Sequence, residues 1–137
     1  MQNLHFKGLS LQYTGWQLPP HGYLGIQACH FTKGRNWKRP WARIPATVCF
    51  NFAEGCSLRD STIAHVGCCG IELVDSCHQN VVDGNDIYDV SGNGIMLGGP
   101  REEDGVPRGN RISNNHVHAC GVEYYGAVGI WVGFADG

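Results

Sequence analysis

The chain has 137 residues, of which 16% are charged and 42% are hydrophobic, and its formal net charge is −2. These values exclude a disordered chain, and no apolar run approaches the length of a membrane span. The sequence also lacks the basic footprint that nucleic-acid-binding proteins usually carry. Residues 1–11 alternate polar and apolar side chains, a pattern unlike a signal peptide.

Short strands are predicted from pairs of apolar residues five positions apart. In chain order the pairs are Leu4 with Leu9, Leu58 with Ile63, Val82 with Ile87, and Ile112 with Val117. A second strand, with the pattern Gly-Ile-x-Leu or Gly-Ile-x-Val, follows the last three pairs at 70–73, 94–97 and 129–132, and residues 48–50 resemble it without the glycine. The equivalent residues Val48, Ile71, Ile95 and Ile130 are 23, 24 and 35 positions apart, which identifies a repeat of about two dozen residues.

Three insertions interrupt the repeat. Residues 12–46 are rich in Trp, Pro and Gly, residues 100–109 form a polar loop, and residues 122–127 lengthen a turn. The second and third insertions explain the long last step. No amphipathic cap is evident at either end, so we expect the segment to be part of a longer stack of coils.

A repeat of this length with aliphatic strands predicts stacked coils, because one coil cannot bury its own apolar face. Stacking places equivalent residues above each other at about 4.8 Å. Helical stretches, which a leucine-rich horseshoe needs, are not visible. We therefore predict an all-β parallel β-helix of about four coils. The expected inward ladders are Ile71, Ile95 and Ile130; Leu73, Leu97 and Val132; Ile63, Ile87 and Val117; and Val66, Val90 and Cys120. Ser61, Asn85 and Asn115 should share one turn position.

Three stretches resemble the right-handed parallel β-helix superfamily, which includes pectate lyases and several glycoside hydrolase families. They are Phe6-Lys7-Gly8-Leu9-Ser10-Leu11 followed by Trp16, then 89–95 followed by Gly98-Gly99, and 121–124 followed by Gly129-Ile130-Trp131. The closer resemblance is to large bacterial β-helix proteins that act on polysaccharides. It implies a right-handed β-helix, a polysaccharide or oligosaccharide partner, and a secreted or periplasmic parent protein.

In that superfamily the substrate lies across a strand face, which here is the Gly-Ile-x-Leu strand. Its outward positions are Cys49, Glu72, Met96 and Trp131. Trp131 offers a flat surface on which a sugar ring can stack, and Glu72 lies two coils away. The alternative is that Trp131 covers an adjacent insertion.

Glu123 is the candidate general acid or base, because it lies in the lengthened turn beside Tyr124 and Tyr125. Burial against aromatic rings would raise a carboxyl pKa toward the working range. The alternative is a glutamate that bonds turn amides or an arginine. His65 and Asp89 fall at the same place in successive coils and should be neighbours, either orienting a general base or forming a structural polar pair.

Glycoside hydrolysis usually needs two carboxyl groups, and Asp75 or Asp136 offers a second one. A lyase would instead need a cation beside a substrate carboxylate, for which Arg101 or Arg108 in the inserted loop could serve. The face strands carry no basic residue, so the sequence favours a hydrolase over a lyase. A non-catalytic β-helix that binds glycan or serves as a surface scaffold is the other hypothesis.

No metal site and no cofactor are predicted. The seven cysteines include no C-x-x-C pair, and their odd number leaves at least one outside any pairing within the chain. His116 and His118 form an H-x-H pair that flanks Val117, but the sequence identifies no third ligand. Such a pair is more often part of a solvated strand face.

Overall fold

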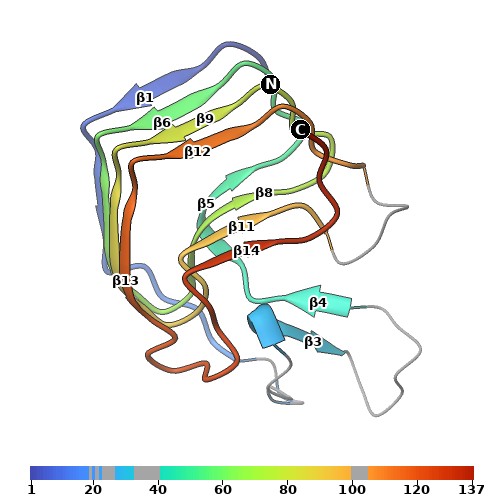
Figure 1. Cartoon of the computed structure of the whole chain (residues 1–137). Helices are drawn as coiled ribbons and strands as arrows, with labels where there is room; N and C mark the ends of the chain where they lie inside the picture. Colours follow the sequence, from blue (N-terminus) through green and yellow to red (C-terminus); the bar gives the residue numbers. More distant parts are fainter. Residues whose placement is uncertain (19, 21, 23–26, 33–40, 100–104) are drawn as a thin grey trace.

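The structure is a computed structural model that describes residues 1–18, 20, 22, 27–32, 41–99 and 105–137. Twelve short strands in these ranges form three four-stranded parallel sheets, and the chain passes through the sheets in the same order in every coil (Figure 1). The first sheet contains β1 (His5–Lys7), β6 (Ser57–Arg59), β9 (Val81–Asp83) and β12 (Arg111–Ser113). The second contains β2 (Ser10–Gln12), β7 (Thr62–Val66), β10 (Asp86–Val90) and β13 (His116–Cys120). The third contains β5 (Ala46–Phe50), β8 (Cys69–Leu73), β11 (Ile95–Leu97) and β14 (Ile130–Val132). The predicted parallel β-helix of about four coils is confirmed.

The strand register confirms the predicted ladders. Ile95 pairs with Ile71 on one side and with Ile130 on the other, and Val48 extends this column into the first coil. Ile71 and Ile95 are fully buried, because each has a coil above and below it. The other three predicted columns have the same register. Aliphatic side chains stacked across coils therefore form the core.

The first coil differs from the sequence-based alignment. Phe6 pairs with Leu58 and Leu11 pairs with Ile63, so these two residues, and not Leu4 and Leu9, continue the inward columns. Both pairs have the spacing of five. A shift of two residues along a strand also leaves the inward and outward faces unchanged, so alternation could not distinguish them.

The chain bends at positions where the backbone is left-handed. Near the end of each second-sheet strand the same position has a positive φ, at Tyr13 (59°), His65 (53°), Asp89 (48°) and Ala119 (48°). This conformation costs a residue with a side chain roughly 1–2 kcal/mol. Its recurrence in every coil means that the stack imposes it.

Asparagine side chains link the coils at two other corners. The Asn85 Nδ2 group donates to Asn115 Oδ1 at 2.9 Å, and Ser61 N donates to Asn85 Oδ1 at 3.1 Å, which confirms the shared turn position. Asn80 and Asn110 repeat the arrangement before β9 and β12, with a 2.9 Å bond between their side chains. These amides satisfy backbone groups that the turns would otherwise leave buried without partners.

The largest insertion folds against the third sheet. It contains η1 (Gln27–Cys29) and the antiparallel pair β3 (His30–Thr32) and β4 (Trp41–Arg43), which lies beside that sheet in Figure 1. The buried side chain of Asn93 connects this insertion to the segment that leads into β14, because its Nδ2 donates to Ala28 O at 2.7 Å and its Oδ1 accepts from Val128 N at 2.8 Å. Part of the third sheet is therefore covered.

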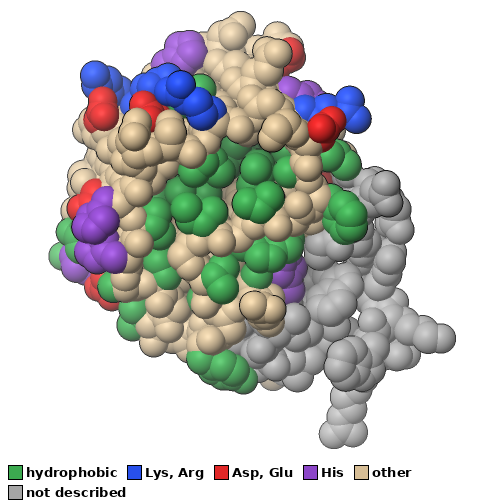
Figure 2. Space-filling view, viewed as in Figure 1, with side chains coloured by type: hydrophobic (Ala, Val, Ile, Leu, Met, Phe, Trp, Pro, Cys, Tyr) green, Lys and Arg blue, Asp and Glu red, His purple; other side chains and the backbone are tan. Residues whose placement is uncertain are grey.

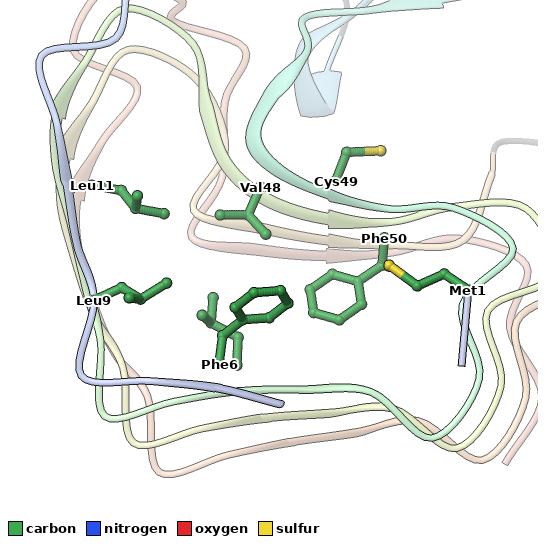
Figure 3. A pocket seen from close by; sticks show the side chains of 8 residues that line it. Met1, Phe6, Leu9, Leu11, Val48, Cys49 and Phe50 are labelled. Carbon is green, nitrogen blue, oxygen red and sulfur yellow. The ribbon is translucent and has the colours of Figure 1, made fainter. Parts of the chain in front are cut away.

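The interior is open at both ends of the stack. At the end formed by the first coil, Phe6, Leu9, Leu11, Val48 and Phe50 line an apolar pocket, and Figure 3 shows their side chains pointing into it. Figure 2 shows hydrophobic side chains grouped in the middle of the molecule, in the region that the strands surround in Figure 1. At the other end Ile130, Val132 and Phe134 are exposed.

Candidate functional site

The third sheet carries the predicted outward column, but this column is not an open groove. Cys49, Glu72, Met96 and Trp131 follow one another in register, as expected. Glu72 and Met96 are nevertheless buried, at 7% and 1% exposed. Arg43 of β4 lies over Glu72, with 3.6 Å between Nε and Oε2. The carboxylate of Glu72 therefore faces an arginine of the insertion, and the expectation of an accessible binding face at this residue is wrong.

Trp131 contacts the insertion as well. Its ring lies 4.7 Å from that of His30, at an interplanar angle of 62°. His30 is buried, and burial lowers its pKa below the usual value, with a further lowering from Arg43. This contact corresponds to the alternative in which Trp131 covers an insertion.

The three consecutive residues of the lengthened turn, Glu123, Tyr124 and Tyr125, differ in burial. Tyr124 is buried, and its ring packs edge-on against Trp16 at 5.8 Å, while burial raises the pKa of its hydroxyl. Glu123 and Tyr125 are exposed. Glu123 thus lacks the burial against aromatic rings that was expected to adapt it for acid–base chemistry.

The other described candidates for the third-sheet face, Asp75 and Asp136, lie after the ends of β8 and β14. Asp75 is partly buried two residues after β8, and Asp136 forms an exposed ion pair with Arg108, at 3.6 Å. Arg101 lies outside the described residues.

His65 and Asp89 meet on the second sheet, as predicted. His65 Nδ1 lies 2.6 Å from Asp89 Oδ2, and both residues occupy the left-handed position near the end of their strands. The carboxylate accepts a hydrogen bond from the Nδ1–H group. In the neutral ring the other nitrogen, Nε2, is therefore a hydrogen-bond acceptor. The pair therefore holds an imidazole in one tautomer and orientation.

Aromatic and imidazole rings run along the stack on both sides of this pair. Tyr13 stacks on His65 at 5.3 Å, Tyr88 meets His65 edge-on at 5.5 Å, and Tyr88 stacks on His118 at 5.2 Å. His118 in turn stacks on His116 at 4.2 Å. These five rings, which we call the ring ladder, cross all four strands of the second sheet.

Carboxylates accompany the ring ladder. Asp86 Oδ1 lies 3.1 Å from His116 Nδ1 and 3.5 Å from His118 Nε2, and Asp89 pairs with His65. Figure 2 shows histidine and acidic side chains together at the left edge of the molecule, where Figure 1 places the second sheet. The arrangement offers flat rings, hydrogen-bond donors and hydrogen-bond acceptors on one accessible face.

Sequence reasoning missed Tyr13, Tyr88 and Asp86. The repeat contained a signal for the last two, because Asp86 precedes Ile87 as His116 precedes Val117, and Tyr88 follows Ile87 as His118 follows Val117. Residues at equal distances from an inward ladder are neighbours across coils. Tyr13 carried no such signal, since the first coil was aligned two residues out of place.

The comparison with known families agrees with the coil architecture. The family model described as a right-handed beta helix region matches residues 21–137. The chain belongs to this right-handed β-helix family. The match extends over the last three coils of this β-helix and most of the large insertion, so it accounts for the three parallel sheets. No curated protein and no solved structure matches the chain.

Two further features of the β-helix bear on its chemistry. Its seven cysteines all lie in the described ranges and form no disulfide there. Among the described residues, no helix has the length and apolar character required to cross a membrane.

Proposed function

We propose that this β-helix binds an oligosaccharide or polysaccharide across the outer face of its second sheet. The ring ladder, with Asp86 and Asp89 beside it, is the observation that supports the proposal. Sugars combine apolar C–H surfaces with many hydroxyl groups, so they suit a face on which rings alternate with carboxylates and imidazoles. A polysaccharide ligand would also fit a secreted or periplasmic parent protein.

The location on the second sheet is supported by accessibility. Tyr13 is 79% exposed, whereas Met96, at the centre of the third-sheet face, is 1% exposed. Among the described residues, none buries Tyr13, and the side chains of His65 and Asp89 are also partly exposed, so a glycan could contact the ring ladder there. To reach Glu72, it would have to displace the contact with Arg43.

The binding test compares two tyrosines. Purified protein is screened against a panel of plant and microbial glycans, and the affinity for each bound glycan is measured by calorimetry in the presence of EDTA. Tyr88→Ala should weaken binding at least about tenfold, since stacking and interface aromatics typically contribute 1–3 kcal/mol. Tyr125→Ala removes an equally large exposed side chain that is not part of the ring ladder, and it should leave the affinity unchanged. Binding that depends on Tyr125 and not on Tyr88 would place the site at the lengthened turn instead.

Hydrolysis of the bound glycan is a second candidate function, favoured by the short contact between His65 and Asp89. A neutral imidazole held in one tautomer by a carboxylate has a free ring nitrogen that can act as a general base. Asp86 is the other carboxylate on β10. Three residues along a strand span about 10 Å, slightly more than the separation of about 6.5–9.5 Å between the carboxyl groups of inverting enzymes.

Turnover is tested by incubating the bound glycans and measuring the release of reducing ends. Asp89→Asn and His65→Gln should each abolish it, while Glu123→Gln should have no effect. Products that also absorb in the ultraviolet would indicate an elimination reaction, and so a lyase. Glycan binding without any released product would support the non-catalytic β-helix.

A further inference from the structure

We propose that Asp86, His116 and His118 form a binding site for a divalent transition-metal ion. The site shares these three residues with the proposed glycan face, but metal binding there does not require a glycan. It differs from the sequence-based expectation, in which the H-x-H pair of β13 had no third ligand.

Strand geometry explains how the three side chains come together. Residues two apart in a strand point to the same side, so His116 and His118 both lie on the outer face while Val117 points into the core. The parallel register pairs Asp86 with His116 and Tyr88 with His118. The carboxylate of Asp86 therefore lies beside the two imidazoles.

The distances agree with metal coordination. One nitrogen of each histidine and one oxygen of Asp86 lie within 4.8 Å of one another. The two distances from Asp86 Oδ1, 3.1 Å to His116 Nδ1 and 3.5 Å to His118 Nε2, bracket the separation of about 3.3 Å between ligands of a tetrahedral zinc ion with bonds of 2.0–2.1 Å. Small side-chain rotations would direct all three atoms at one ion.

The ligand types select the class of metal. Two imidazoles and one carboxylate suit Zn²⁺, Cu²⁺ or Fe²⁺, whereas Ca²⁺ and Mg²⁺ prefer sets of oxygen ligands. Three protein ligands leave a fourth position open, as in zinc sites that bind water or substrate. The stacking of Tyr88 on His118 limits rotation of one ligand ring and so prepares the site.

The alternative is a hydrogen-bonded cluster in which Asp86 accepts hydrogen bonds from ring N–H groups of the histidines and binds no metal. Titration of the protein with Zn²⁺, followed by calorimetry, distinguishes the metal site from the hydrogen-bonded cluster. Thiols also bind zinc, so the titration uses a protein with Cys49→Ser and Cys120→Val. The second substitution restores the residue found at the equivalent positions, Val66 and Val90.

The expected result is one Zn²⁺ per chain, with an affinity that falls at least tenfold in both Asp86→Asn and His118→Gln. His5→Gln removes an outward histidine of the first sheet and is the matched control, with an unchanged affinity. The imidazole NMR signals of His116 and His118 should shift with added Zn²⁺, while those of His5 do not. Circular dichroism checks that each variant keeps its strands.

The proposal is overturned if no Zn²⁺ binds, or if Asp86→Asn and His118→Gln bind it as tightly as the His5→Gln control. Its outcome is separate from that of the proposed function. Metal binding is measured without glycan and glycan binding in EDTA, so either can fail alone.

Discussion

The side chain of Asn85 donates from Nδ2 to Oδ1 of Asn115 in the next coil, at 2.9 Å, while its own Oδ1 accepts from the backbone of Ser61 in the coil before. Nδ2 also donates to Leu58 O at 3.1 Å. One buried amide thus joins three successive coils. The contribution of this amide can be measured.

Asn85→Ala should destabilise the fold by about 2–4 kcal/mol, because it leaves the Ser61 N–H and the Leu58 carbonyl buried without partners. Urea denaturation followed by circular dichroism gives the change in the free energy of unfolding. Asn114→Gly is the control, since Asn114 is exposed, its side chain bonds only Asp83 among the described contacts, and glycine readily adopts its left-handed φ of 54°. Equal losses in the two variants would contradict the role of the buried ladder.

Gly94→Ala should destabilise the protein by about 1–3 kcal/mol through overpacking. A Cβ atom at this position would overlap the Val117 side chain and lie 2.5 Å from the carbonyl oxygen of Gly129 in the next coil. Gly15→Ala is the matched control, because a Cβ there meets no atom within 4 Å. Thermal denaturation should show a lower melting temperature for Gly94→Ala only. A melting temperature as high as that of the control would show that the coils can separate enough to admit a methyl group.

Substitutions at Ala119, whose φ is 48°, test the strain at the left-handed position near the ends of the second-sheet strands. Ala119→Gly should stabilise the protein by up to about 1 kcal/mol, since glycine adopts this conformation without the penalty of a Cβ atom. Ala119→Val should destabilise it, because a β-branched side chain tolerates positive φ least. Chemical denaturation of both variants gives their free energies of unfolding and so their order of stability. A valine variant more stable than the glycine variant would refute this account.

His30 predicts a pH dependence of stability. Burial lowers its pKa in the folded protein below the unfolded value of about 6.5. As the pH falls from 6.5, the unfolded chain gains a proton that folded His30 takes up only at lower pH, so the free energy of unfolding decreases. His30→Phe should reduce the pH dependence of the free energy of unfolding between pH 6.5 and the lower pKa of folded His30. Chemical denaturation at a series of pH values measures this free energy. If it changes equally with pH in the variant and the unchanged protein, the pKa of His30 is not lowered by folding.

Cys49 should react slowly with alkylating agents. Cys49 is exposed as a residue, but desolvation of its thiol, with a further contribution from the Glu72 carboxylate, raises its pKa to about 12, and only the thiolate reacts. Glu72→Gln removes the contribution of the carboxylate and should speed alkylation of Cys49 at pH 8 several-fold, as measured by mass spectrometry of the labelled peptide. Glu54→Gln, a change at an exposed glutamate on another sheet edge, should not alter the rate.

The columns of the core were predictable because they depend only on the repeat. Equivalent positions such as Ile71 and Ile95 must stack if coils stack, whatever the loops do. The meeting of His65 with Asp89 followed from the same rule. Two residues at equal distances from a column are neighbours, which also predicts the place of Asp86 once the rule is applied to every outward position.

The covering of the third sheet could not be predicted in this way. Residues 12–46 do not repeat, so no alignment indicates which sheet they contact. The contact of Arg43 with Glu72 and that of His30 with Trp131 depend on how β3 and β4 fold back. The proposed site lies instead on the second sheet, where Tyr13 is exposed and the side chains of His65 and Asp89 are partly exposed among the described residues.

The shared backbone conformation of Tyr13, His65, Asp89 and Ala119 separates what the protein displays from what holds it together. The bend is set by the coil, and the side chain at the bend takes no part in the inward columns. Four unrelated amino acids occupy this one geometric position. A designer could therefore rewrite the outer surface coil by coil, choosing each displayed group independently, while leaving every packed aliphatic residue as it is.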